Sequence, residues 1–207
     1  MSMQDSGGTN NANFATPPEY TLTTPNRDGA LQNDIIVHEF THGITNRLTG
    51  GGTGRCLQTT EAGGMGEVFN NHPGIRTHLY STDASINYLR YSSIKQLHEV
   101  HDIGEVWANM LHNAYAALVE VHGFSSTAMD DPSGTEGNIV WLHLFIDALF
   151  LQPCNLTFPN ARDPWIQVDQ NRYDGANVCT LWNAFASRGL GMNATNYVDD
   201  TSVSSGC

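Results

Sequence analysis

The chain has 207 residues, and its 9 lysine and arginine residues against 21 acidic residues give a formal net charge of −12. A nucleic-acid-binding surface needs clustered basic side chains. This chain has a single lysine, Lys95, and scattered arginines, which argues against nucleic acid and anionic membranes as partners. Its 40% hydrophobic content and its length suit one domain with a core. The longest apolar stretch, 139–151, contains His143 and Asp147 and is shorter than the roughly 20 residues that cross a bilayer.

The surface chemistry is typical of a secreted protein. Charged residues make up only 14%, so much of the polar surface must come from Asn, Ser, Thr and Gly. Two glycosylation acceptor sequences, Asn155-Leu-Thr and Asn193-Ala-Thr, fit the same location. The first residues contain no apolar stretch that could serve as a signal peptide. We therefore expect the secretion signal on a longer precursor, or the chain to be a fragment.

The cysteines indicate disulfides rather than a metal knuckle. They lie far apart and form no Cys-x-x-Cys pair, at Cys56, Cys154, Cys179 and Cys207. Up to two disulfides are therefore expected. The pair Cys154 and Cys179 closes a moderate loop and is our preferred prediction.

Residues 1–33 are rich in Gly, Asn, Thr and Pro and predict a loop region, with one short extended piece near 10–15. A helical domain is predicted over 34–207. Its first helix starts at Asp34 and stops at the glycines 50–52, and its apolar face comprises Ile35, Ile36, Val37, Phe40, Ile44 and Leu48.

Four further helices are predicted from apolar residues spaced three and four apart. The longest spans 98–121 and stops at Gly123. The others span about 137–151, 161–170 and 179–188. Few strand signals are present, so the fold class is mainly α.

The first helix carries His38-Glu-Phe-Thr-His42. A spacing of four residues places both imidazoles on one helix face, where they can share a zinc ion. Glu39 can then accept the proton of a water whose pKa the zinc lowers to about 7. This is the chemistry of a hydrolase. Two histidines leave a third protein ligand to find, and Glu61 and Glu67 are the candidates.

His38-Glu-Phe-Thr-His-Gly-Ile-Thr-Asn-Arg-Leu-Thr-Gly-Gly51, followed by Glu61-Ala-Gly-Gly-Met-Gly-Glu67, resembles the signature of the fungalysins, secreted fungal metalloproteinases related to thermolysin. Further matches follow in the same order. They are Asn10-Asn-Ala-Asn-Phe-Ala-Thr-Pro-Pro18, Arg27-Asp-Gly29, Tyr80-Ser-Thr, Val100-His-Asp-Ile-Gly-Glu-Val-Trp-Ala108, Leu151-Gln-Pro-Cys154, Ala161-Arg-Asp163 and Phe185-Ala-Ser-Arg-Gly-Leu-Gly191.

The resemblance implies the roles of five residues. His38, His42 and Glu67 would bind one Zn²⁺, and Glu39 would be the general base. His101 would donate a hydrogen bond to the tetrahedral intermediate, with His98, one turn earlier, as its competitor. The resemblance also implies that Glu61 supports the site or the fold, and that the backbone of Asn11 and Ala12 holds an extended peptide by strand addition.

The resemblance further implies an extracellular enzyme that cleaves proteins or peptides and is made with an inhibitory propeptide. Its fold would be the helical C-terminal half of a thermolysin-like α+β zincin, with 1–33 a remnant of the β-rich half and 34–207 the zinc-peptidase domain.

The sequence departs from the family in three places. A strand is missing between Asn11 and Arg27, and the family's Gly-Trp-Ser-Asp and its helix are missing after Glu67, where Asn71 occupies the register of the aspartate. The propeptide and most of the β-rich half are also missing. A truncated or internally deleted member is therefore expected, and a catalytically impaired zinc-binding fragment is the alternative to an active peptidase.

Overall fold

The computed structural model describes residues 33–66 and 77–207, with side chains from Val37 onward. The elements in chain order are α1 (Asn33–Leu48), η2 (Thr49–Gly51), α2 (Thr60–Met65), η3 (Tyr91–Gln96), α3 (Val100–His122), α4 (Gly137–Leu151), α5 (Phe158–Tyr173) and α6 (Val178–Ser187). Apart from two isolated bridges near the C-terminus, the described residues contain no strand. The mainly helical class predicted from the sequence is confirmed. None of the described helices is long and apolar enough to cross a membrane.

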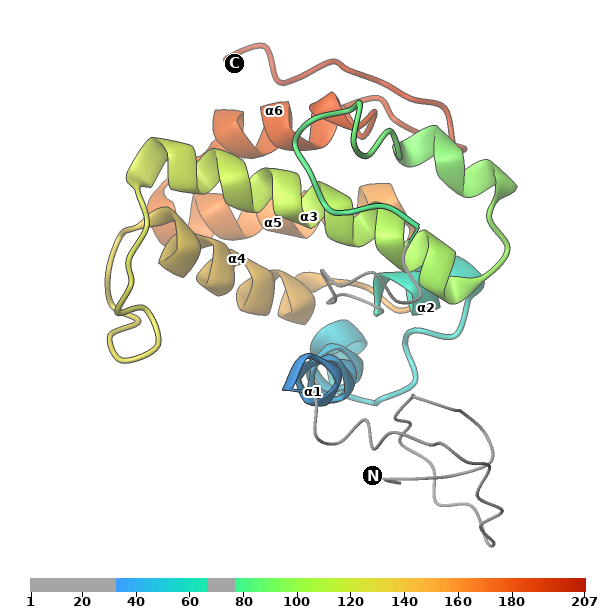
Figure 1. The fold of residues 1–207 in the computed structure, drawn as a ribbon, viewed down its shortest axis with the longest axis horizontal. Helices are drawn as coiled ribbons and strands as arrows, with labels where there is room; N and C mark the ends of the chain where they lie inside the picture. Colours follow the sequence, from blue (N-terminus) through green and yellow to red (C-terminus); the bar gives the residue numbers. More distant parts are fainter. Residues whose placement is uncertain (1–32, 67–76) are drawn as a thin grey trace, which may run out of the picture.

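The long helix α3 lies between α6 and α4 and packs against both, and α5, behind α3 in this view, packs against α4 and α6 (Figure 1). Large aromatic side chains join these helices in one core. The Trp107 ring on α3 lies 5.0 Å from that of Phe158 on α5 and 6.1 Å from that of Phe185 on α6, centroid to centroid. Buried aromatic and aliphatic surface of this kind is the main source of stability. This core therefore holds the packed helices in fixed positions relative to one another.

The predicted helices are all present, and their limits differ where capping residues decide. Helix α3 begins at Val100 because the Glu99 side chain accepts hydrogen bonds from the backbone of His101 and Asp102. Helix α5 begins at Phe158, not Ala161, because Thr157 and Asn160 form a reciprocal capping box. Because of these caps, the two helices start two and three residues away from their predicted first residues.

The buried face of α1 differs from the predicted one. Val37 and Phe40 are 48% and 69% exposed, although both were expected on the apolar face. The buried positions are instead His38, Thr41 and Thr45. Threonine tolerates burial here because its hydroxyl bonds within the helix, as Thr41 does to the Val37 carbonyl at 2.7 Å and Thr45 to the Thr41 carbonyl at 3.1 Å. Ile44 and Leu48 do pack partly against the core, as predicted.

The predicted disulfide between Cys154 and Cys179 is wrong. The bonds are Cys56–Cys154 and Cys179–Cys207. Helix α5 lies between Cys154 and Cys179, and its 16 residues carry the chain about 24 Å along one axis. Loop length alone suggested the pair, whereas a rigid helix keeps the two cysteines apart. The expectation of two disulfides is confirmed.

Candidate metal centre

Helix α1 brings the imidazoles of His38 and His42 together. Their Nε2 atoms are 3.1 Å apart, and the ring centroids are 4.6 Å apart with an interplanar angle of 82°. His38 is 9% exposed, and His42 is half-buried. Two nitrogen donors therefore converge on one point beside α1, as the spacing of four residues predicted.

This geometry suits zinc. A tetrahedral zinc ion with Zn–N distances of about 2.0–2.1 Å holds two nitrogens about 3.4 Å apart. The separation of 3.1 Å between the two Nε2 atoms is close to that value. Imidazole nitrogen is also a preferred ligand of zinc. The histidine pair could therefore supply two of the ligands of such a site.

Glu39, the predicted general base, follows His38 directly on α1, and its side chain is half-buried.

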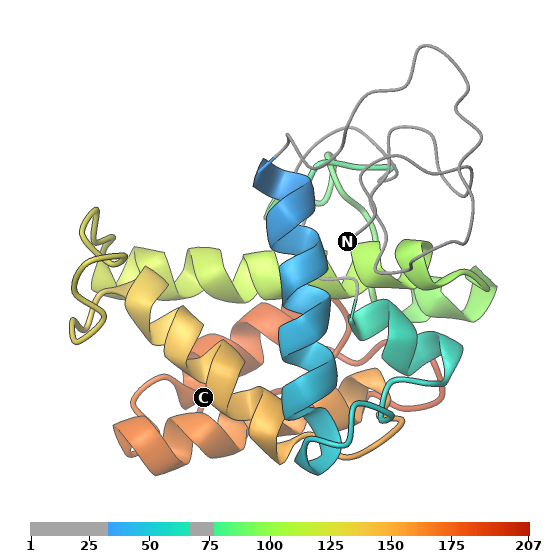
Figure 2. The ribbon, with the colours of Figure 1, turned by 90° about the horizontal axis from the view of Figure 1, so that it is seen from below.

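Helix α1 lies across the direction of α3 in Figure 2 and is seen nearly end-on in Figure 1. The C-terminal end of α1 is fixed by the backbone hydrogen bond from Gly50 to the carbonyl of Gln152 at 3.0 Å. Gly50 has a φ of +64°, and a Cβ there would clash with Cys56 Sγ, so only glycine fits this turn. The helix that carries the histidines is thus tied to the end of α4.

The third predicted ligand, Glu67, lies outside the described residues. Helix α2 ends at Met65, two residues before it. The position of α2 depends on Gly64, because a Cβ there would lie 2.5 Å from Cγ2 of Ile103 on α3. Gly63 and Gly64 of the Gly-Gly-Met-Gly motif thus allow α2 to pack closely against α3. Among the described residues, no group of three His, Cys, Asp or Glu side chains could hold a metal ion.

Glu61, the other candidate ligand, is used in structural contacts. Its side chain is buried, Oε1 accepts the Phe158 backbone N–H at 2.8 Å, and Oε2 accepts the Tyr197 hydroxyl at 2.9 Å. This hydrogen bond, with burial and the nearby charge, raises the pKa of Tyr197 to about 12. Both carboxylate oxygens join α2 to distant parts of the chain. This arrangement favours a structural role for Glu61 over a place in the metal centre.

His101 lies in the first turn of α3 and is held by Glu99. Its Nδ1 is 2.6 Å from Glu99 Oε1, and its backbone N–H donates to Glu99 Oε2 at 2.7 Å. The side chain is 43% exposed. The competitor His98 lies before the helix begins and is exposed. A carboxylate at Nδ1 orients an imidazole and leaves Nε2 directed elsewhere, a feature that favours His101 over His98.

Partial desolvation raises the pKa of Glu99, and hydrogen bonds from the His101 side chain and backbone and from Asp102 outweigh it. The net result is a pKa below the ordinary value of 4.5. The carboxylate of Glu99 is therefore charged at neutral pH. This charge favours the proton on Nδ1 of His101.

A row of buried polar side chains on α3 was not predicted from the sequence. Glu105 is 1% exposed, and its carboxylate accepts hydrogen bonds from the backbone N–H groups of Thr77 and His78 at 2.8 and 2.7 Å. One and two turns further along, Asn109 accepts the Ser81 backbone N–H and Asn113 donates to the Ser81 carbonyl. The spacing of Glu105, Asn109 and Asn113 was the available signal, because polar residues four apart within an apolar helix require partners.

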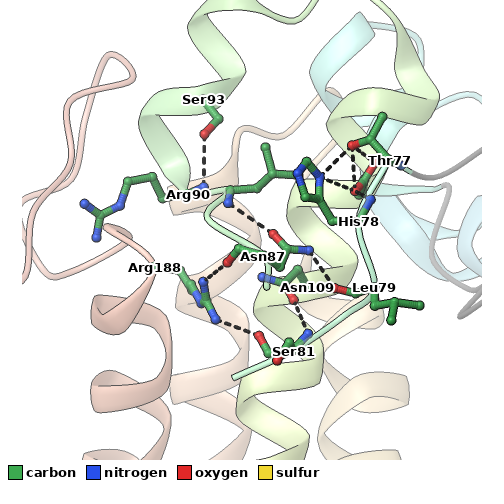
Figure 3. Close-up of polar contacts among 11 residues, drawn as sticks. Thr77, His78, Leu79, Ser81, Asn87, Arg90, Ser93, Asn109 and Arg188 are labelled. Atoms are coloured by element: carbon green, nitrogen blue, oxygen red, sulfur yellow. Dashed lines mark hydrogen bonds and ion pairs between the residues drawn. The ribbon is translucent and has the colours of Figure 1, made fainter. Parts of the chain in front are cut away.

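Arg188 completes the anchoring of this segment. Figure 3 shows its guanidinium directed at Ser81 and Asn87, whose carbonyls it binds at 2.6 and 2.5 Å. Its Nε donates to Asn113 Oδ1 at 3.2 Å. The chain that follows residues 67–76 is thus fixed by side chains of α3 and by Arg188, at the end of α6.

Comparison with known proteins gives one matching family and close relatives. A family model described as Fungalysin metallopeptidase (M36) matches residues 1–71 and 68–194. The chain is 41% identical over 237 residues to "Probable extracellular metalloproteinase 3" of Trichophyton verrucosum (strain HKI 0517), covering 94% of this chain and 37% of that protein. It is 40% identical over 235 residues to "Extracellular metalloproteinase 3" of Trichophyton soudanense, covering 94% of this chain and 60% of the relative. It is also 40% identical over 235 residues to "Extracellular metalloproteinase 3" of Trichophyton rubrum, covering 94% of this chain and 37% of that protein.

The matches also locate a difference in length. The chain spans little more than a third of the length of the T. verrucosum and T. rubrum relatives. The 237 matched positions correspond to 94% of 207 residues, about 195, so about 40 positions are gaps in this chain. The two segments matched by the family model meet at 68–71, directly after Glu67. This is where the resemblance to the family led us to expect a missing segment.

Proposed function

The chain belongs to the fungalysin metallopeptidase family, and on that premise we propose that it is a secreted zinc-dependent endopeptidase. Its substrates are proteins or peptides, and its longer precursor carries an inhibitory propeptide. Residues 1–33 are the remnant of a β-rich half, and 34–207 form the zinc-peptidase domain. The relatives named above are extracellular metalloproteinases, which supports this assignment.

The convergence of the His38 and His42 Nε2 atoms, 3.1 Å apart on one face of α1, carries the proposal. In it, these two nitrogens and the Glu67 carboxylate hold one Zn²⁺. When bound, zinc supplies a Lewis acid that polarises the scissile carbonyl and lowers the pKa of a water molecule. The family assignment and the donor set both favour zinc.

Glu39 is the general base of the proposed reaction. Its position directly after His38 supports this role, in which it accepts the proton of the attacking water and later delivers it to the leaving amine. The imidazolium form of His101, whose Nδ1–H is held by Glu99 at 2.6 Å, donates a hydrogen bond from its Nε2–H to the oxyanion.

A second candidate function is a zinc-binding fragment with impaired catalysis. The total of about 40 gap positions and the meeting of the two matched segments at 68–71 favour it. The missing segment includes the aspartate that the family places near the ligands. Loss of such a partner typically costs 10- to 100-fold in metal affinity or activity.

The test combines elemental analysis of bound zinc with hydrolysis of a generic protein substrate. Three forms of the chain are compared: wild type, Glu39→Gln, which keeps both histidines, and Glu120→Gln as a control for an exposed glutamate on α3. One zinc per chain in all three, with hydrolysis lost only in Glu39→Gln and after chelation, supports the peptidase. One zinc without hydrolysis supports the fragment. Absence of zinc contradicts both.

A further inference from the structure

We propose that Asn155 carries an N-linked glycan in the secreted protein and that Asn193, the second acceptor sequence, does not. Both asparagines are exposed, so exposure does not separate them. Their side-chain amides differ in what they already bind. The proposal rests on secretion and is independent of peptidase activity.

Asn155 presents its amide nitrogen to solvent. Its backbone N–H donates to the Cys56 carbonyl at 2.7 Å, and its Oδ1 accepts the Gln58 backbone N–H at 3.0 Å. Within the described residues, Nδ2 of Asn155 has no hydrogen-bond acceptor. A glycan on Nδ2 leaves the Oδ1 atom free to accept, so both contacts survive the modification.

The backbone around Asn155 holds this orientation. Asn155 adopts a φ of +51°, in the left-handed region that asparagine tolerates well. The neighbouring Cys154 is bonded to Cys56, and Leu156 is 1% exposed. A sugar attached here projects from a fixed corner between α4 and α5. Thr157, the hydroxyl residue of the acceptor sequence, is exposed at the start of α5.

Asn193 uses its amide nitrogen within the fold. Its Nδ2 donates to Ser202 Oγ at 2.9 Å, and its backbone N–H donates to Asp200 Oδ2 at 3.0 Å. Ser202 in turn donates from both its hydroxyl and its backbone N–H to the Asp200 carboxylate. A glycan replaces one hydrogen of Nδ2 and places a bulky sugar beside this group. It therefore interferes with the packing of Asp200 and Ser202 against Asn193.

The reaction requires a lipid diphosphate oligosaccharide, the glycan donor of the eukaryotic secretory pathway. The bond between the anomeric carbon of the first sugar and the diphosphate oxygen breaks, and the diphosphate leaves with the electron pair. Nδ2 forms the new bond to that carbon and releases one proton. Transfer precedes folding, so the folded geometry acts afterwards. Chains modified at Asn193 fold poorly in the C-terminal segment and are retained by cellular quality control.

The experiment expresses the chain with an added leader in a yeast host. Peptide N-glycosidase in H₂¹⁸O converts each glycan-bearing Asn to ¹⁸O-labelled Asp, which is located by mass spectrometry in the secreted and retained fractions. We expect label at Asn155 in both fractions and label at Asn193 only in the retained one. An unlabelled Asn155 in either fraction, or equal labelling of Asn193 and Asn155 in the secreted fraction, overturns the proposal.

Two variants separate glycosylation from folding. Asn155→Asp keeps an oxygen acceptor for the Gln58 N–H and removes the acceptor nitrogen, so it should fold and lose one glycan. Asn193→Gln should keep the glycan of the secreted wild type. A secreted Asn155→Asp chain that still carries a glycan contradicts the assignment. Zinc content and hydrolysis are expected to be the same with and without the glycan, so this test and that of the peptidase fail separately.

Discussion

The Glu99 carboxylate binds the His101 ring through one oxygen and the His101 backbone through the other. Oε1 lies 2.6 Å from Nδ1, and Oε2 accepts the His101 N–H at 2.7 Å. One side chain thus both starts α3 and fixes the imidazole in its first turn. Helix capping and orientation of a candidate catalytic residue are therefore coupled at this position.

We predict that Glu99→Gln lowers kcat/KM about tenfold with little change in KM. A tenfold loss corresponds to about 1.4 kcal/mol, near the lower end for a hydrogen bond to a charged group. Steady-state kinetics on a peptide substrate measures it. His98→Ala is the matched control, because His98 is exposed and precedes the helix. The assignment is wrong if His98→Ala loses activity and Glu99→Gln does not.

The same substitution gives a pH-dependent stability difference. The pKa of Glu99 is lowered in the folded chain. Its stabilising contribution is therefore fully present above the ordinary value of 4.5 and is lost as the pH falls through the lowered value. The difference in Tm between wild type and Glu99→Gln should be constant from about pH 6 to pH 8 and should shrink toward about pH 3. A difference that grows on acidification contradicts the expected sign.

We predict that Gly64→Ala destabilises the protein by about 1–3 kcal/mol, the usual cost of overpacking. The new Cβ would lie 2.5 Å from Cγ2 of Ile103 and would push α2 away from α3. Urea unfolding measures the loss, and zinc affinity should fall with it, because α2 leads directly to Glu67. Gly43→Ala on α1 is the control, since no atom lies within 4 Å of its Cβ. There we expect no loss, and a gain of up to about 1 kcal/mol.

Tyr197→Phe removes one donor from the buried carboxylate of Glu61, and we expect a loss of about 1–3 kcal/mol at neutral pH. The pKa of Tyr197 is raised from 10 to about 12 in the folded chain. The advantage of wild type should therefore be constant below about pH 9 and should decrease between pH 10 and about pH 12. Chemical denaturation of both chains at pH 8 and pH 11 tests this. An advantage that increases in alkali would show that the hydroxyl does not donate to Glu61.

The two disulfides should contribute unequally. Cys56–Cys154 closes 98 residues and Cys179–Cys207 closes 28, and the chain-entropy model gives about 4.7 and about 3.6 kcal/mol. We expect the double serine variant of the first pair to lose more stability than that of the second. Non-reducing peptide mapping should recover both pairs. A peptide that links Cys154 to Cys179 would contradict the observed pairing.

The sequence alone determined those features that depend on spacing along one helix. Residues four apart share a face of any α-helix, so the convergence of His38 and His42 followed from their positions. The stop of α3 at Gly123 and the mainly helical class followed from local pattern in the same way. The family assignment followed from motif order, which the comparisons confirmed.

Only the tertiary structure decided the contacts between distant segments. Glu61 meets Tyr197 across 136 residues, and Glu105 meets Thr77 across 28. The disulfide partners and the burial of Thr41 in place of Phe40 were decided in the same way. No local pattern encodes these contacts, because they depend on how whole helices pack. The difference is physical: backbone hydrogen bonds within a helix fix the spacing of its side chains, whereas packing of the assembled core selects their distant partners.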